Sequence, residues 1–230
     1  LAKQYFSNNE YDKAFEWYEK SAIGGNTDAQ INLANMYCDG KGTPQNYKNA
    51  RKWYKLNAKD DTYVQNMLGD MYYDGKGITK NLKIAFDWYK KSANRGNATA
   101  QYNVGFMYYN GKGTAKDLTK AFEWYGKSAN GGDIKAQYKL ADIYYYGDGI
   151  EKNYIKAFEW YGKSANGDNI NALHKLANMC FMGEGTEKDY KKAFEWYEKS
   201  ANRGNTFAQN ILGMMYYDGK GTKKDLKMAF

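Results

Sequence analysis

AFEWY at residues 14–18 is the first of six related pentapeptides in this chain, and their spacing decides the fold. The other five copies are ARKWY at 50–54, AFDWY at 85–89, and AFEWY at 121–125, 157–161 and 193–197. Ala229 and Phe230 begin a seventh copy. From Ala14 to Ala229, the leading alanines lie 36, 35, 36, 36, 36 and 36 residues apart. A fixed period of this length is typical of stacked repeats, in which no single unit can bury its own apolar face.

The first half of each period carries a helical pattern, called helix A below. In residues 97–109, Ala100, Val104 and Met107 lie on one apolar helical face behind a capping residue, Asn97. Capping residues stand at the same place in other periods: Asp61, Asp133, Asn169 and Asn205. A Gly-X-Gly loop follows, where glycine permits the positive φ that ends a helix.

The second half carries another helical pattern, called helix B. After the capping residue Asp117, the apolar residues Leu118, Ala121, Phe122 and Tyr125 recur at helical spacing. Equivalent capping residues are Asn46, Asn81, Asn153, Asp189 and Asp225. We therefore predict an all-α fold, an α-solenoid of about six stacked helix pairs with one pair per period.

These repeats resemble the Sel-like repeat family, a branch of the tetratricopeptide superfamily in which the loop of each helix pair is lengthened. The motifs that carry the resemblance are Leu68-Gly69-Asp70-Met71-Tyr72, Asp74-Gly75-Lys76-Gly77, Ala85-Phe86-Asp87-Trp88-Tyr89 and Lys91-Ser92-Ala93. The resemblance covers nearly the whole chain and implies a right-handed solenoid of antiparallel helix pairs. Members of the family act as adaptors that assemble protein complexes, so the resemblance implies a non-catalytic interaction scaffold.

The repeat register predicts a single solenoid domain over residues 1–230. Residues 1–25 lack the Gly-X-Gly loop and resemble a partial tetratricopeptide unit, and residues 205–230 form a truncated repeat. Complete Sel-like repeats are expected at 26–60, 61–96, 97–132, 133–168 and 169–204. Because both ends then fall inside the array, we expect the native protein to extend in both directions or to associate end to end.

Several site classes find no support in the residues. His174 is the only histidine, and Cys38 and Cys180 lie four periods apart without a C-x-x-C spacing. The glycine loops lack the strand context of a phosphate-binding motif. We therefore predict no enzyme activity, no metal and no cofactor, with both cysteines as buried free thiols. The Trp-Tyr pair of every pentapeptide is predicted to be core.

The sequence leaves the cellular compartment open. No apolar run approaches the length that spans a bilayer, and no signal peptide is visible. The patterns therefore predict no membrane span and assign no compartment.

One face of helix A varies from repeat to repeat while the opposite face stays constant, and we call it the variable stripe. It covers an arc of about 120° and contains aromatic, Asn and Met side chains but no glutamate, a composition expected at interfaces. Its residues, repeat by repeat, are Asp28, Ile31, Asn32, Asn35, Cys38; Tyr63, Asn66, Met67, Asp70, Tyr73; Thr99, Tyr102, Asn103, Phe106, Tyr109; Lys135, Tyr138, Lys139, Asp142, Tyr145; Asn171, His174, Lys175, Asn178, Phe181; and Phe207, Asn210, Ile211, Met214, Tyr217.

We predict that the variable stripe lines a groove that binds a peptide or a segment of another protein. Aromatic side chains would anchor the partner, and asparagines would hydrogen-bond to its backbone. The predicted partner-binding residues are Tyr63, Asn66, Asp70, Tyr102, Asn103, Phe106, Tyr138, Lys139, Asp142, His174, Phe207 and Asn210.

Binding of single-stranded RNA is the alternative, because helical repeats of this length can read one base each. The net charge of +8 and a possible Tyr102–Tyr138–His174 stacking ladder favour it. Against it, three aspartates and three lysines cancel within the stripe, whereas nucleic-acid binding requires a clustered basic surface. We therefore expect a protein partner rather than a nucleic acid.

Overall fold

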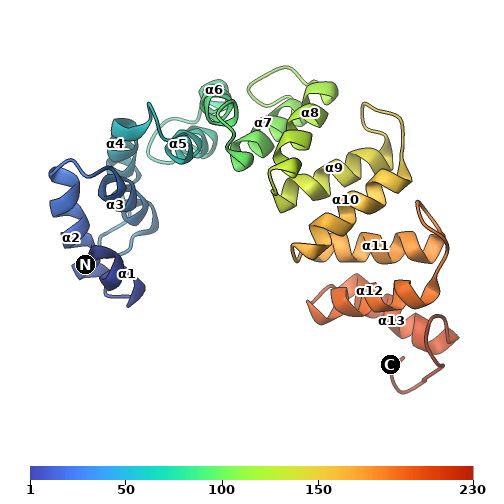
Figure 1. Ribbon diagram of the computed structural model, residues 1–230. Helices are drawn as coiled ribbons and strands as arrows, with labels where there is room; N and C mark the ends of the chain where they lie inside the picture. Colours follow the sequence, from blue (N-terminus) through green and yellow to red (C-terminus); the bar gives the residue numbers. More distant parts are fainter. Residues whose placement is uncertain (230) are drawn as a thin grey trace. The chain divides into compact units, whose positions relative to one another are not determined.

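The computed structural model describes residues 1–229, and every regular element in that range is an α-helix (Figure 1). The chain divides into two compact units, one spanning Leu1–Asp117 and the other beginning at Leu118. The predicted seventh pentapeptide reaches Phe230, which lies outside the described residues. The helices of the first unit are α1 (Ala2–Ser7), α2 (Tyr11–Ile23), α3 (Thr27–Asp39), α4 (Tyr47–Asn57), α5 (Thr62–Asp74), α6 (Leu82–Ala93) and α7 (Ala98–Asn110). Those of the second are α8 (Leu118–Asn130), α9 (Ile134–Tyr146), α10 (Tyr154–Asn166), α11 (Ile170–Met182), α12 (Tyr190–Asn202) and α13 (Thr206–Asp218).

Consecutive helices pack against each other within each unit, as the prediction of an all-α solenoid requires. From α3 onward, odd-numbered helices are helix A and even-numbered helices are helix B of successive repeats. The first pair, α1 and α2, is joined only by residues 8–10, whereas residues 40–46 join α3 to α4. The short first connection follows from the absence of a Gly-X-Gly loop there.

Capping side chains begin the helices at the predicted places. Asp61 accepts a hydrogen bond from the backbone N–H of Val64 at 2.9 Å, and Asn97 accepts one from Ala100 at the same distance. Each cap satisfies one of the backbone N–H groups that the first turn of a helix leaves unpaired. Equivalent bonds are made by Asn26, Asn46, Asn81, Asp133, Asn153, Asn169, Asp189 and Asn205.

The Gly-X-Gly loops are structural turns, as the sequence predicts. Gly75 adopts a left-handed conformation with φ 78°, and its N–H donates to the carbonyl of Met71 at 2.9 Å. Gly77 also has a positive φ, and a Cβ atom there would lie 2.6 Å from the side chain of Tyr47 in the preceding repeat. The second glycine therefore allows the loop of one repeat to pack closely against the helix B of the repeat before it.

Neighbouring helices are also joined by side chains that recur at fixed positions. Ser92 in α6 donates to the backbone carbonyl of Thr62 in α5 at 2.6 Å. Gln101 in α7 donates to the carbonyl of Ala93, near the end of α6, at 3.2 Å. The first bond joins the two helices of one repeat, and the second joins helix A to the helix B of the repeat before it, so both satisfy backbone groups while fixing how the helices stack.

The Trp-Tyr pair of each pentapeptide is divided between core and surface. The tyrosines are buried, whereas the tryptophans are half-buried and Trp17 is exposed. Adjacent helical residues project about 100° apart, so the two rings cannot share one environment. The outer face of Trp160 is covered by Lys163, whose Nζ lies 3.8 Å from the ring centroid. The prediction of a core residue is confirmed for the tyrosines and wrong for Trp17. It holds in part for Trp53, Trp88, Trp160 and Trp196, which are half-buried and pack against the core.

No helix within the described residues combines the length and the apolar character needed to cross a bilayer.

Candidate functional site

The variable stripe is tied to the core by a hydrogen bond that recurs in four repeats. A buried tyrosine hydroxyl needs an acceptor, and here it finds one on the neighbouring helix A. The phenol of the pentapeptide donates to an Asn or Asp side chain nineteen residues earlier. The pairs are Tyr54 with Asn35 at 2.5 Å, Tyr89 with Asp70 at 2.7 Å, Tyr161 with Asp142 at 2.6 Å, and Tyr197 with Asn178 at 2.5 Å. These amides and carboxylates therefore have a structural task, whatever else they contact.

Two of the asparagines expected to bond a partner's backbone bond each other instead. Asn66 is only 3% exposed. Its side-chain carbonyl accepts from Asn103 at 3.0 Å, and its amide donates to Asp70 at 3.2 Å. This geometry corrects the expectation for Asn66, because a buried amide with both ends engaged is closed to a partner. Asn103 stays half-buried at the edge of the same network.

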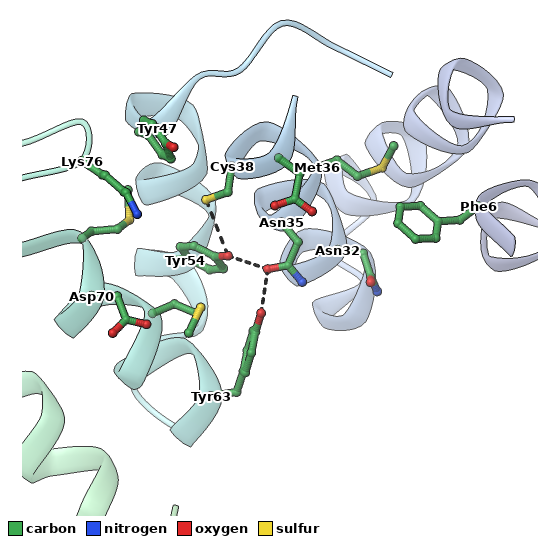
Figure 2. Close-up of a pocket in the computed structure, with 13 residues that line it drawn as sticks. Phe6, Asn32, Asn35, Met36, Cys38, Tyr47, Tyr54, Tyr63, Asp70 and Lys76 are labelled. Carbon is green, nitrogen blue, oxygen red and sulfur yellow. Dashed lines mark hydrogen bonds between the residues drawn. The ribbon is translucent and has the colours of Figure 1, made fainter. Parts of the chain in front are cut away.

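A cavity of about 460 Å³ opens along the stripe in the first unit. Figure 2 shows Tyr54 and Tyr63 both pointing at Asn35. The side-chain oxygen of Asn35 accepts a hydrogen bond from the Tyr63 hydroxyl at 3.0 Å. Tyr63 is 42% exposed, so its ring remains available beside the cavity. The complete lining is Phe6, Asn32, Asn35, Met36, Cys38, Asp39, Tyr47, Tyr54, Tyr63, Met67, Asp70, Met71 and Lys76.

A second cavity, of about 260 Å³, lies farther along the same unit. Its lining is Asp70, Tyr73, Tyr89, Tyr102, Asn103, Phe106 and Met107. The ring of Phe106 meets that of Tyr73 edge-on at 6.4 Å, and the Lys112 ammonium lies 4.9 Å from the Phe106 centroid. Asp70 thus borders both cavities.

In the second unit the predicted residues occupy more varied environments. Tyr138 is half-buried against the ring of Tyr161 at 5.5 Å, and burial raises its pKa to about 12. His174 lies between Tyr197 and Phe207, with ring distances of 5.7 and 6.4 Å. Burial and the neighbouring Lys175 lower the pKa of this imidazole, so it is neutral at pH 7.

The remaining predicted residues of the second unit lie at its stripe surface. Lys139 forms an ion pair with Asp142 at 3.4 Å, and Phe207 is exposed. Asn210 borders a cavity of about 700 Å³ together with Met214 and Tyr217. A smaller cavity of about 190 Å³ is also lined by stripe residues, among them Phe181 and Ile211.

The predicted ladder is divided between the two units. Tyr102 belongs to the first unit, whereas Tyr138 and His174 belong to the second. Stacking of Tyr102 on Tyr138 therefore stays a prediction.

The thiols offer little chemistry. Cys180 is buried and Cys38 is half-buried, and burial raises the pKa of both. A raised pKa leaves a thiol protonated and poorly nucleophilic at neutral pH. Within residues 1–229, no group of three His, Cys, Asp or Glu side chains is placed to hold a metal ion.

The spacing of residues in the sequence contains a signal for this hydrogen-bond network. In four repeats an Asn or Asp precedes the pentapeptide tyrosine by nineteen residues. That spacing links the variable stripe to a constant core residue. The polar side chains at this one register are therefore explained by the fold. Some apolar side chains of the stripe, among them Met67, Tyr138 and Phe181, also pack against the core.

Comparison with known proteins agrees with the geometry. The family model of the Sel1 repeat matches the chain seven times, at residues 7–26, 27–59, 62–97, 98–133, 134–169, 170–205 and 206–230. Comparison with curated proteins gives no match.

Two solved structures are similar over most of the chain. A protective antigen present in uropathogenic Escherichia coli strains, which displays an SLR fold, is 32% identical with a TM-score of 0.90. The match covers 94% of this chain and 46% of the antigen, so the chain spans about half of that protein's length. A Sel1 repeat protein from Oxalobacter formigenes is 29% identical with a TM-score of 0.89, covering 99% of this chain and 94% of the other.

Sel1 repeat proteins are in general protein-interaction scaffolds, and their fold is typically non-catalytic. The seven matched repeats cover nearly all of the sequence, and the helix pairs, caps and loops described above follow the same period. The chain belongs to the Sel1 repeat family.

Proposed function

We propose that this chain is a non-catalytic scaffold that binds an extended segment of another protein along the variable stripe. The observation that carries the proposal is the position of the cavities: in each unit, two of them are lined by stripe residues. An extended segment places successive side chains on alternate sides of its backbone, so it can fill separate cavities along a groove.

The side chains that would contact the partner are those that the fold leaves accessible. Tyr63 and Phe207 are exposed, and Phe106 is half-buried at the second cavity. Aromatic rings of this kind contribute much of the binding free energy at protein interfaces. Asn210 is exposed and retains an amide that can bond to a peptide backbone.

A selection with short random peptides displayed on phage tests this proposal on the full chain. Peptides that are enriched should bind the Tyr63→Ala/Phe106→Ala double variant at least about tenfold more weakly. The matched control is Leu56→Ala, which removes a side chain 64% exposed on α4 and outside the stripe. Equal binding to the double variant and the wild type would place the site elsewhere on the molecule.

Salt dependence distinguishes a peptide groove from an RNA-binding surface. Affinity for a fluorescent oligouridine would fall steeply with ionic strength if phosphate contacts supplied the binding energy. The stripe carries equal numbers of aspartates and lysines, so selected peptides should show a shallower dependence. Tight, steeply salt-dependent binding of oligouridine that competes with the peptides would favour the RNA alternative.

A further inference from the structure

Three aspartates lie on the variable stripe, and they differ in how their charge is balanced. Asp28 forms an ion pair with Lys3 at 3.7 Å, and Asp142 forms one with Lys139 at 3.4 Å. Asp70 has no ion-pair partner among residues 1–229. It is therefore the stripe carboxylate whose charge the described part of the chain leaves unbalanced.

The groups that donate hydrogen bonds to Asp70 are neutral. One carboxylate oxygen accepts from the Tyr89 hydroxyl at 2.7 Å, and the other accepts from the Asn66 amide at 3.2 Å. Burial raises the pKa of Asp70, because a poorly solvated carboxylate is harder to ionise. Two charged side chains also act on it: Asp74 raises the pKa, and Lys76, which pairs with Asp74 at 2.8 Å, lowers it.

Asp70 also borders both stripe cavities of the first unit. On one side are Tyr63 and Met67, and on the other are Tyr102 and Phe106. A partner segment that fills both cavities must pass this carboxylate. We propose that the stripe of the first unit selects an extended segment with a lysine or arginine side chain that pairs with Asp70, flanked by apolar side chains in the two cavities.

This inference rests on the proposed function and adds a chemical requirement to it. A half-buried carboxylate that has no ion pair and only neutral hydrogen-bond donors gains from a cationic partner, because attraction between charges strengthens as water is excluded. The aliphatic stem of lysine or arginine can lie against the methionine and aromatic walls while its charged end reaches the carboxylate. An acidic side chain at the same place would meet a like charge and be rejected.

The test uses the peptides selected by phage display and two matched variants of the full chain. Asp70→Asn removes the charge but keeps an oxygen that accepts from Tyr89, as Asn35 and Asn178 do in their own repeats. Asp87→Asn makes the same change at an exposed position of α6 that lies outside the stripe. Asn is native at the register of Asp70 in other repeats and Asp87 is exposed, so both variants should fold.

Selected peptides should share a lysine or arginine, and synthetic copies should bind Asp70→Asn about tenfold or more weakly. Their affinity for Asp87→Asn should stay within about twofold of the wild type. Replacing the peptide arginine by citrulline, or its lysine by norleucine, should cost about as much as Asp70→Asn.

The outcomes separate this inference from the proposed function. Peptides that depend on Tyr63 and Phe106 but carry no basic residue, or bind Asp70→Asn unchanged, would overturn the inference and leave the groove intact. Peptides that ignore the Tyr63→Ala/Phe106→Ala substitution would overturn both. Failure to enrich any peptide on the wild-type chain would count against both as well.

Discussion

The repeat of α5 and α6 and the repeat of α9 and α10 share a hydrogen bond from a buried tyrosine to an aspartate. They differ in whether that aspartate also has an ion-pair partner. In both, a buried tyrosine donates to an aspartate on helix A, Tyr89 to Asp70 and Tyr161 to Asp142. Asp142 has a lysine three residues earlier, Lys139, within ion-pair distance. At the same register before Asp70 the chain has Met67.

The comparison shows that a position can be fixed by the fold and still differ in what it offers a partner. The hydrogen bond from the tyrosine explains why an acceptor is present at this register. It does not explain why the acceptor is a charged group without a counter-charge in one repeat. Whatever distinguishes Asp70 from Asp142 must come from their neighbours, and those neighbours can be exchanged by mutation.

The largest expected effect is on the free energy of unfolding and comes from removing the buried tyrosine that both repeats contain. Tyr89→Ala and Tyr161→Ala should each lower the free energy of unfolding by about 3–5 kcal/mol, because both rings are buried and their loss leaves a cavity. Urea denaturation followed by circular dichroism measures this. Trp160→Ala, at the half-buried member of the pair, should cost clearly less; an equal loss would mean that both rings are core.

A smaller effect should separate the two hydroxyls. Tyr89→Phe removes the closer of the two hydrogen-bond donors to Asp70 and should lower the free energy of unfolding by about 1–3 kcal/mol. Tyr161→Phe leaves Asp142 its ion pair with Lys139, so about 0.5–1.5 kcal/mol is expected. Urea denaturation again provides the measurement, and the reverse order would contradict the role assigned to Lys139.

The pH dependence of binding should follow the protonation of Asp70. Burial raises the pKa of this carboxyl above its ordinary value of 3.8. Peptide affinity should therefore be full where Asp70 is ionised and fall as the pH drops through that raised pKa. Fluorescence anisotropy between neutral and mildly acidic pH measures the change, and Asp70→Asn should flatten it.

The free energy of unfolding should depend on pH in the opposite direction to peptide affinity. A raised carboxyl pKa means that the folded chain holds the proton more tightly than the unfolded chain does. The contribution of Asp70 to the free energy of unfolding should thus decrease as the pH rises from the ordinary value through the raised one. Comparison of wild type with Asp70→Asn in urea isolates this contribution.

The smallest expected contribution to stability is the ion pair gained by exchanging the neighbours. Met67→Lys gives Asp70 the lysine that Asp142 already has, and the ion pair itself should contribute only about 0.5 kcal/mol to the free energy of unfolding. Met67 is half-buried against the core, so Met67→Gln is the control for its lost packing. Binding of basic peptides should nevertheless weaken to the level of Asp70→Asn. Unchanged peptide affinity in Met67→Lys, with folding intact, would show that the charge of Asp70 is not what the peptide recognises.

The sequence predicts local structure well because caps and turns depend on near neighbours. Asp61 and Asn97 cap their helices, and Gly75 ends its helix, for reasons contained within a few residues. The period of the pentapeptide then predicts the stacking, since each unit must cover the next. These local rules recovered the all-α solenoid, both capping registers and the structural role of the glycine loops.

The candidate site was predicted less completely, because side-chain partners on other helices decide it. Asn66 varies between repeats as a free surface residue would, yet it is buried between Asp70 and Asn103. Variation alone could not distinguish freedom from a local pairing of variable residues. The partial exposure of the tryptophans was missed for a related reason, since a constant residue need not be a buried one.

A double-mutant cycle tests the account most directly. Affinities of a selected basic peptide and its citrulline or norleucine analogue are measured against wild type and Asp70→Asn. The account predicts strong coupling: the analogue should bind wild type about tenfold more weakly but bind Asp70→Asn almost as well as the basic peptide does. An equal loss for the analogue on both proteins would show that the peptide's charge does not meet Asp70 and would contradict the account.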